Sequence, residues 1–519
     1  MLASRLLKQS LVGASVVTIS ANLLGRFVGF AREATIAGYF GTSATFDTFV
    51  LAFTIPELLS FVIFAALPTA IIPWLANIRG TESNEAATFR RGLLFFSVGF
   101  GLLSLAIFVF RGSLLSLLAP DQPESQRFLG ERLFGILSWV VLFRGLEAYF
   151  RGWLHARKHF VVPAIAPIIM NLVVLASVLM LCGRLEIEAL AIGWLAGSAT
   201  LLLLNGYMSL RIITPAGPKT NSRSVIPLLG LAATVAAIEL ISFIYPAVDR
   251  YLATRFLGEG QIAALRYATF LCMLPTGIVV VAFSHASFPW ISDLAESAEV
   301  DKLGQLYTRS VRAILFVMLF VAAGMVVFSQ DIVKLAFERG IFDTASTELT
   351  AGPVRWYALG IALYSVYIYQ MRIYYAHRAL SQLGSILLAM LAVKVMTSLL
   401  LVSLMGHNGL ALASTLAWVF GFAFMTFHLS RSANLKLGRP LGLFVSRTIL
   451  PLALAVVAWL GLCRLWPEPE SYTFLSRVGR LLCIGLPGLV LYVIIAHLSR
   501  LTEPADIWRT LRKRLTPDN

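Results

Sequence analysis

Fourteen long hydrophobic runs follow one another along this chain, separated by short polar segments. Each run contains about 20 mostly apolar residues, the length that an α-helix needs to cross the hydrocarbon core of a bilayer. The pattern therefore predicts an all-α integral membrane protein with about 14 transmembrane helices. The predicted spans are residues 11–31, 46–74, 91–111, 133–153, 161–182, 189–210, 226–246, 266–290, 311–329, 355–375, 384–405, 409–430, 445–465 and 478–498.

The composition favours the same class. Of the 519 residues, 58% are hydrophobic and 13% are charged, whereas a soluble domain carries roughly 25% charged residues. The net charge of +15 does not indicate nucleic-acid binding, because the Lys and Arg residues cluster between the spans. The four cysteines have no CxxC spacing, so we interpret them as small buried hydrophobes and not as a metal or disulfide framework.

Positive charge alternates from one loop to the next. Basic loops follow the even-numbered spans, as with Arg157 and Lys158 after the fourth span. Acidic or balanced loops follow the odd-numbered spans, as with Asp121 and Glu124 after the third. Because Lys and Arg are enriched in cytoplasmic loops, both termini are predicted to lie in the cytoplasm.

The chain also contains an internal repeat. The echoed pairs are IPWLAN at 72 and FPWISD at 288, IFVFRGSLLSLLA at 107 and MVVFSQDIVKLAF at 325, and LHARK at 154 and YYAHR at 374. Three echoes in the same order, about six spans apart, indicate duplication into two copies of the same orientation, and such parallel repeats pack as two lobes around a site. The predicted division is an N-lobe at 1–214, a cytoplasmic linker at 215–224, a C-lobe at 225–435, two further spans at 436–498 and a basic cytoplasmic tail at 499–519.

Three charges interrupt the first two spans. Arg26 lies inside the first run, Arg32 ends it, and Asp47 opens the second. A charge that faces lipid costs several kcal/mol, so such side chains usually face the interior of a helix bundle. For Arg32 and Asp47 the alternative is that the side chain reaches the membrane interface. Three prolines at 56, 68 and 73 predict a kinked second helix of the kind that lines cavities.

The fourth span carries Arg144, Glu147 and Arg151, whose spacings of three and four place them on one helical face. Glu147 can therefore pair with either arginine. One interpretation is a structural ion pair near the cytoplasmic end of the span, and the other is part of a binding site.

Three more ionisable residues lie inside spans, namely Glu239, His285 and Lys394. Residues of this kind are functional candidates by default, here as coupling or cavity residues. The alternatives are a protonated Glu239 bonded to a neighbouring helix, since burial raises the pKa of a carboxyl group, and structural hydrogen-bond donors at His285 and Lys394.

The sequence has no GxSxG motif, no HExxH motif and no Gly-rich phosphate loop beside a strand. This favours transport over enzymatic activity, and we expect neither a catalytic residue nor a cofactor nor a metal site.

Several longer motifs are more specific. They are RFVGFARE at 26–33, TFDTFVLAFTIP at 45–56, GWLHARKHFVVPAIAPIIMN at 152–171, VDRYLATRFLGEGQIAALRYA at 248–268, LPTGI at 274–278, FERGIFD at 337–343 and GHNGLALAST at 406–415. In this order the motifs resemble the MurJ/MviN family of lipid II flippases, which belongs to the multidrug/oligosaccharidyl-lipid/polysaccharide exporter superfamily. The resemblance covers roughly residues 10 to 430.

The resemblance implies fourteen helices in two lobes around a cationic cavity, with the last two spans forming a groove for a lipid tail. It implies alternating access in the bacterial inner membrane, and a role in peptidoglycan synthesis and cell shape. The implied substrate is a glycan linked to undecaprenyl diphosphate, with lipid II as the leading candidate, and the other partner is membrane lipid. Arg26, Arg32 and Asp47 match charges of the family's functional set. The coupling ion is not implied.

The chain also departs from the family pattern. Ser60 and Phe61 stand where the family has an arginine pair, Ala65 or Ala66 where it has a glutamate, and Phe270 where it has an arginine. Export of another lipid-linked saccharide, cation-coupled antiport and a non-transporting scaffold therefore stay open as alternatives. We hypothesise that Arg144 replaces part of the lost charge and that Glu147 holds it in position. The candidate substrate-binding residues are Arg26, Arg32, Asp47, Arg144 and Glu147.

Overall fold

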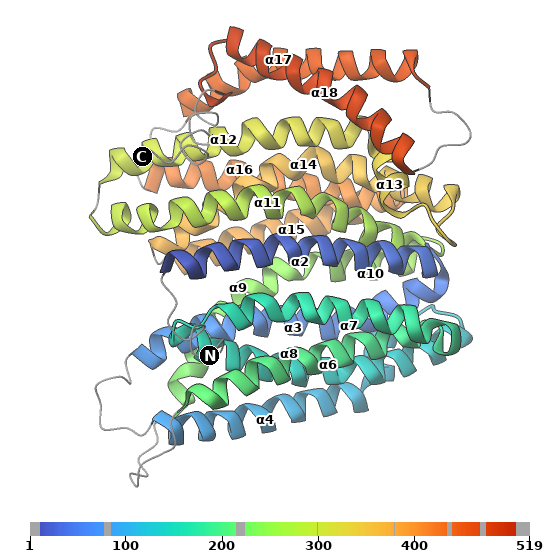
Figure 1. Cartoon of the computed structure of the whole chain (residues 1–519), viewed down its shortest axis with the longest axis vertical. Coiled ribbons are helices and arrows are strands. Elements are labelled where there is room, and N and C mark those ends of the chain that lie inside the picture. Colours follow the sequence, from blue (N-terminus) through green and yellow to red (C-terminus); the bar gives the residue numbers. More distant parts are fainter. Residues whose placement is uncertain are drawn as a thin grey trace. The chain divides into compact units, whose positions relative to one another are not determined.

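The computed structural model is helical throughout the residues that it describes, which are 11–76, 85–213, 224–297, 299–377, 379–432, 438–467 and 474–504 (Figure 1). Fourteen of the described helices have 18 or more residues and coincide with the fourteen predicted spans. They are α2 (Leu11–Phe40), α3 (Ala44–Ala76), α4 (Glu85–Val109), α6 (Glu124–Ala156), α7 (Val161–Leu185), α8 (Glu188–Ile212), α9 (Ile226–Phe243), α11 (Gln261–Glu296), α12 (Val300–Val327), α14 (Thr344–Ala376), α15 (Leu380–Met405), α16 (His407–Ser432), α17 (Gly438–Leu465) and α18 (Phe474–Leu498). Three shorter helices lie between them, α5 (Arg111–Leu118), α10 (Tyr245–Phe256) and α13 (Ser329–Phe337).

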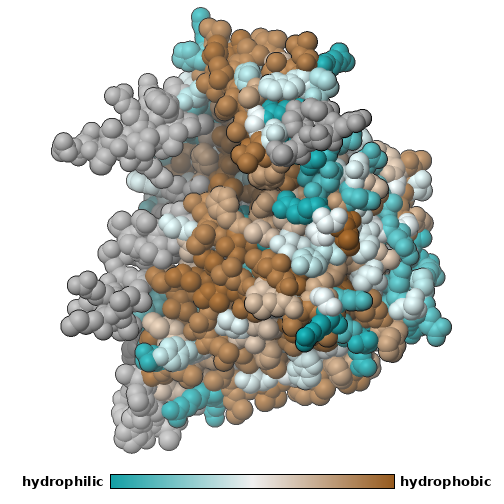
Figure 2. Space-filling model, turned by 45° about the vertical axis from the view of Figure 1, so that its right-hand side comes forward, coloured by the Kyte–Doolittle hydropathy of each residue, from teal (hydrophilic) through white to brown (hydrophobic). Residues whose placement is uncertain are grey.

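Twelve of the described helices are long and apolar enough to cross a membrane, and α2 and α14 are the other two of the fourteen. Many large apolar side chains are exposed, among them Met180, Leu404 and Leu465. Figure 2 shows brown, hydrophobic residues over much of the visible face, while teal, hydrophilic residues gather along its right-hand edge. Soluble monomers rarely expose apolar patches of that extent. The predicted fold class, an all-α multi-pass membrane protein, is therefore confirmed.

The helices also repeat in order. The helices α3, α4, α5, α6, α7 and α8 are followed by α11, α12, α13, α14, α15 and α16, each of which starts 215 to 220 residues after its counterpart. Packing repeats as well, because α6 packs against α4 and α8 as α14 packs against α12 and α16. Even the short helix α5 has a counterpart, α13. The duplication that three short sequence echoes predicted thus extends over six consecutive helices.

By its contacts the chain divides into two compact units. The first unit comprises Met1–Ala263 and Arg339–Phe342, and the second comprises Ala264–Glu338 and Asp343–Asn519. The helices α9 and α10 belong to the first unit, where α9 packs against α3. This contact boundary differs from the predicted lobe boundary at 215–224, because a repeat describes which helices correspond and not which helices pack together. The repeat-based lobes stay a prediction.

The segment Arg339–Phe342 belongs to the first unit through a close backbone approach to the end of α2. The amide of Ile341 donates a hydrogen bond of 2.9 Å to the carbonyl oxygen of Gly38. Gly340 has a φ of +59°, and a Cβ on it would collide with the carbonyl group of Gly38. A glycine is therefore required at position 340 for two reasons: the backbone conformation is left-handed, and there is no room for a side chain.

The core of the first unit is rich in aromatic side chains from three helices. Trp153 of α6 lies edge-on to Trp74 of α3 and Phe89 of α4, with ring centroids 6.4 and 5.0 Å apart. Tyr149 is also buried here, and its hydroxyl donates to the carbonyl oxygen of Phe89 at 2.8 Å. This core fixes the C-terminal halves of α3 and α6 relative to each other, and that half of α6 carries Arg144 and Glu147.

In the second unit, α17 and α18 pack on each other around Trp459 (Figure 1). The indole Nε1 of Trp459 donates to the carbonyl oxygen of Gly485 at 3.2 Å. A Cβ on Gly488 would collide with this indole, so the close approach of the two helices depends on a glycine. Ring contacts of Trp459 with Phe320 and Phe328 join the pair to α12.

Candidate functional site

Arg32 lies in the second half of α2 and is held by side chains of α2, α7 and α8. Its Nη1 donates to Asn171 Oδ1 at 2.6 Å, and its Nη2 lies 3.0 Å from Glu33 Oε2. The guanidinium also lies 4.8 Å from the ring centroid of Trp194. The side chain is 11% exposed, and its buried Nε has no hydrogen-bond partner. Arg32 is therefore an interior residue of the first unit whose Nε–H group is still available to donate a hydrogen bond.

Arg26 lies six residues earlier on α2, about 9 Å away along the helix axis. Six residues turn a helix by about 240°, so the two arginines leave α2 on different sides. Arg26 is half-buried. Among the described residues it makes no hydrogen bond and no ion pair, so nothing in that part of the chain neutralises its charge.

Asp47 lies in the first turn of α3 and is buried. Its Oδ2 accepts a hydrogen bond of 2.6 Å from the amide of Gly260, and its Oδ1 accepts one of 2.7 Å from the amide of Ala263. Gly260 directly precedes α11 and Ala263 lies in its first turn, where no carbonyl of the helix itself can accept from these amides. A carboxylate there also interacts favourably with the helix dipole. The geometry of Asp47 is that of a helix cap, with both oxygens engaged.

On α6 the structure forms one of the two possible ion pairs. Arg151 Nε lies 3.4 Å from Glu147 Oε1, and both side chains are buried. Arg144 instead lies with its guanidinium 4.9 Å from the ring centroid of Phe64, and its Nη1 is 3.8 Å from the sulfur of Met170. The hypothesis that Glu147 pairs with Arg144 is therefore corrected: Glu147 pairs with Arg151 instead. No carboxylate oxygen lies within 4 Å of Arg144 in the described part of the chain.

Two of the candidate arginines reach the same place on α7. Arg144 from α6 contacts Met170, and Arg32 from α2 donates to Asn171, the next residue. The structure therefore brings Arg32 and Arg144 toward one segment of α7, and it engages Asp47 with α11 instead.

The remaining candidates are spread over other helices. Glu239 is half-buried in the middle of α9. His285 lies in α11, and its side chain is outside the described residues. Lys394 is fully buried and donates to the Leu410 carbonyl and the Ser414 hydroxyl of α16, both at 2.8 Å. Its bonds join α15 to α16, as a structural donor would. The described ranges contain no group of three His, Cys, Asp or Glu side chains that could hold a metal ion.

Sequence reasoning missed a partly buried ion pair beside α3, between Arg250 and Glu57. Arg250 of α10 donates to Glu57 Oε2 at 2.8 Å and to the Thr54 hydroxyl at 3.0 Å. Both partners flank Pro56, one of the prolines inside α3. Arg250 lies within a quoted family motif, but its partner is 193 residues away, which no local pattern indicates.

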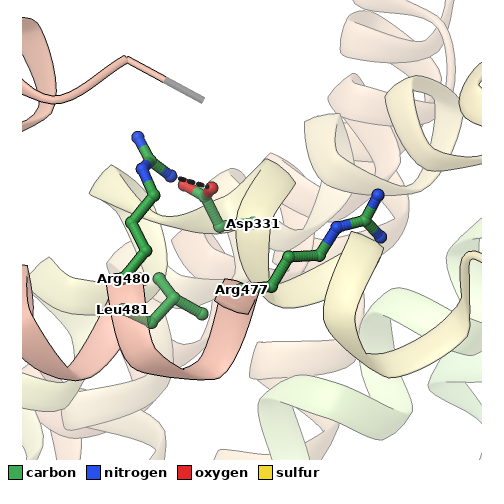
Figure 3. Close-up of a pocket in the computed structure, with 4 residues that line it drawn as sticks. All are labelled: Asp331, Arg477, Arg480 and Leu481. Atoms are coloured by element: carbon green, nitrogen blue, oxygen red, sulfur yellow. Dashed lines mark hydrogen bonds and ion pairs between the residues drawn. The ribbon is translucent and has the colours of Figure 1, made fainter. Parts of the chain in front are cut away.

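A shallow pocket in the second unit lies between α13 and α18 and is lined by Asp331, Arg477, Arg480 and Leu481. Figure 3 shows Arg480 pointing toward Asp331, whose Oδ1 is 2.6 Å from its Nη1, and Arg477 extending to the other side. Arg477 pairs with Glu338 at 3.4 Å. These arginines are matched by carboxylates, so the pocket joins α18 to α13 and offers little free positive charge.

Comparison with known proteins gives a consistent result. The family model described as "Lipid II flippase MurJ" matches residues 36–478. A probable lipid II flippase MurJ of Rhizobium tropici is 27% identical, with 98% of each chain covered. The lipid II flippase MurJ of Burkholderia cenocepacia is 24% identical, with 77% of this chain and 80% of the relative covered.

Solved structures show the same fold. A lipid II flippase MurJ in an inward closed conformation superposes with a TM-score of 0.78 at 21% identity, covering 93% of this chain and 98% of that one. An inward-facing multidrug resistance MATE transporter of the MOP superfamily follows with a TM-score of 0.65 at 13% identity, covering 82% and 99%. Because the family model spans most of the chain and the helices match in order, this protein belongs to the lipid II flippase MurJ family.

Proposed function

We propose that the protein translocates lipid II, a glycan linked to a polyprenyl diphosphate, across the bacterial inner membrane by alternating access. The observation that carries this proposal is the match of the MurJ family model over residues 36–478. The relatives in Rhizobium tropici and Burkholderia cenocepacia are named as flippases of the same substrate. The fold shared with a MATE transporter of the MOP superfamily fits a transporter rather than an enzyme.

The substrate sets a clear chemical requirement. A diphosphate cannot cross hydrocarbon without compensating charge, and an arginine fork matches phosphate oxygens with paired hydrogen bonds. Arg26 and Arg144 fit this role, because no carboxylate oxygen of the described residues lies within 4 Å of either guanidinium. Arg32 contributes its remaining Nε donor from the same region of α7 that Arg144 reaches.

In this proposal two candidate acids act indirectly. Asp47 uses both oxygens to cap α11, so it supports the helix arrangement and does not bind substrate. Glu147 pairs with Arg151 and is a neighbour of the site rather than a ligand. The two last helices, α17 and α18, are proposed to receive the lipid tail, since large apolar side chains such as Leu450, Val457 and Leu482 are exposed along them.

The proposed function is tested by replacing the resident lipid II flippase with this chain in a depletion strain. Growth with normal cell shape is expected from the wild-type chain. A chain that reaches the membrane in normal amount but does not support growth contradicts lipid II transport. Direct binding of purified protein to lipid II and to another polyprenyl-diphosphate-linked saccharide then separates lipid II from the alternative cargo.

A further inference from the structure

A proline interrupts the backbone hydrogen bonds of α3, and a side chain of α6 bonds the backbone carbonyl that is left without a donor. Pro68 has no N–H, so the carbonyl of residue 64, one turn earlier, loses its helical donor. An unsatisfied carbonyl is costly at membrane depth and must find another donor. Arg151 of α6 supplies it, because its Nη2 donates to the carbonyl oxygen of Phe64 at 2.6 Å.

The same guanidinium makes two further contacts. It stacks over the ring of Phe64, 3.2 Å from the centroid. Its Nε faces Glu147 Oε1, which Asn205 of α8 also approaches through its amide nitrogen at 3.4 Å. Arg151 and Glu147 are 8% and 2% exposed. The broken turn of α3, the acid of α6 and the amide of α8 therefore meet at one buried arginine.

This arrangement determines which arginine Glu147 pairs with, and so whether Arg144 has an ion-pair partner. Glu147 is three residues from Arg144 and four from Arg151, so both pairings are open to it on the helix. The carbonyl and the ring of Phe64 fix the guanidinium of Arg151 beside Glu147. Glu147 therefore pairs with Arg151 and not with Arg144. The α6 cluster then has one positive charge in excess, and Arg144 is the arginine with no carboxylate oxygen within 4 Å in the described part of the chain, although Glu147 still acts on it electrostatically.

The internal repeat provides a comparison within the chain. At the offset of the IPWLAN echo, Pro68 corresponds to Ser284, and at the offset of the LHARK echo, Arg151 corresponds to Met371. The second copy thus lacks both the proline that frees a carbonyl and the arginine that satisfies it. Their joint occurrence in the first copy is expected if the two residues serve each other.

We propose that Arg151 is a positioning residue with two tasks, and the second rests on the proposed function. It satisfies the carbonyl that Pro68 leaves open in α3, and it holds Glu147 so that Arg144 stays available to the phosphate oxygens of the substrate. Without Arg151, Glu147 turns to Arg144 and neutralises it.

Three variants separate the two tasks. Arg151→Met leaves the Phe64 carbonyl without a donor and releases Glu147, so both thermal stability and lipid II binding are expected to fall, the latter at least tenfold. Adding Pro68→Ala restores a helical N–H to that carbonyl. The double variant should recover stability but not binding, because Glu147 still neutralises Arg144. Adding Glu147→Gln to Arg151→Met instead should recover binding in the folded fraction but not full stability.

The readouts are the unfolding temperature of the purified full-length protein and its binding of lipid II by native mass spectrometry. Arg127→Met is the matched control, because Arg127 pairs with Glu131 on the same helix through the same atoms and spacing but is 54% exposed. It should change neither readout. Wild-type protein that fails to bind lipid II overturns the proposed function. Wild-type binding together with full recovery of binding by the Pro68→Ala double variant, or no loss in Arg151→Met, overturns the positioning role.

Discussion

At the scale of single residues, the arginines of the first unit differ in what surrounds their charge. Arg32 has a carboxylate, an amide and an aromatic ring around it, and Arg151 has a carboxylate and a carbonyl. For Arg26 and Arg144, no carboxylate oxygen lies within 4 Å in the described part of the chain. A cation that is not already neutralised gains most from an incoming diphosphate, so these two are expected to carry substrate binding.

We therefore expect Arg26→Ala and Arg144→Ala each to abolish or severely reduce transport while membrane abundance stays near normal. Loss of one charge-assisted hydrogen-bonded pair, about 1.5–3 kcal/mol, corresponds to roughly 10- to 100-fold weaker lipid II binding. Complementation of a flippase-depleted strain and immunoblotting of membranes measure the two effects. A collapse of abundance in either variant would assign that arginine a structural role instead.

Arg32→Ala is expected to behave differently, because Arg32 joins α2 to α7 and α8. Removing it takes one partner away from the buried Glu33 and from the half-buried Asn171, and losing a partner typically costs about 1–3 kcal/mol for a buried group. The unfolding temperature and the membrane abundance should therefore both fall along with transport. An Arg32→Ala protein of normal stability would show that these contacts do not support the fold.

At the scale of helices, the ends and breaks of α3 are stabilised by distant parts of the first unit. Asp47 near its start caps α11, Arg250 binds on either side of Pro56, and Arg151 bonds the carbonyl that Pro68 frees. A helix with three internal prolines has lost several backbone bonds, and in a membrane these must be replaced by protein groups. Charged side chains of other helices thus bond α3 beside two of its prolines, and the kink itself stays a prediction.

Replacing Asp47 by Ala removes both cap hydrogen bonds at once. From typical values for caps and charged acceptors, we expect a loss of about 1–3 kcal/mol in the free energy of unfolding. Asp47→Asn keeps one acceptor oxygen and should lose less. Thermal unfolding of the purified protein measures the difference. Unchanged stability combined with lost lipid II binding would return Asp47 to the substrate site.

The pair of helices α17 and α18 is fixed to the rest of the second unit by ion pairs to α13. Arg480→Ala removes the ion pair with Asp331 in a partly buried site, and stability should fall by about 1–3 kcal/mol. The double variant Arg480→Ala with Asp331→Ala should be closer to wild type, because the carboxylate is removed together with the cation that it binds. Equal losses in the single and double variants would mean that the Asp331 carboxylate left behind by Arg480→Ala carries no penalty of its own.

At the scale of the whole molecule, the charge of the loops predicts the orientation in the membrane. Thr220→Cys lies in the loop after α8, outside the described residues, and Ala345→Cys lies in the first turn of α14. In a chain whose four native cysteines are replaced, a membrane-impermeant maleimide should label position 345 in intact cells and position 220 only after permeabilisation. The reverse pattern would overturn the cytoplasmic placement of the termini and the number of spans.

Much of the architecture was determined by the sequence alone. Span length, loop charge and the repeat are local or periodic properties, because a bilayer requires about 20 apolar residues per helix whatever the helix packs against. The fourteen predicted spans therefore coincide with the fourteen long helices. The family could also be recognised, since its motifs are contiguous stretches such as 26–33 and 152–171.

The partners of the charges were decided only by the tertiary structure. The spacing on α6 permits Glu147 to pair with Arg144 or with Arg151, and the choice depends on a carbonyl 87 residues away that Pro68 has freed. Asp47 resembles a site residue in the sequence, but its oxygens bind amides 213 and 216 residues further along the chain. Helix spacing limits which charges can meet, whereas the neighbouring helices determine which of them do, because a buried charge takes the partner that packing places within reach.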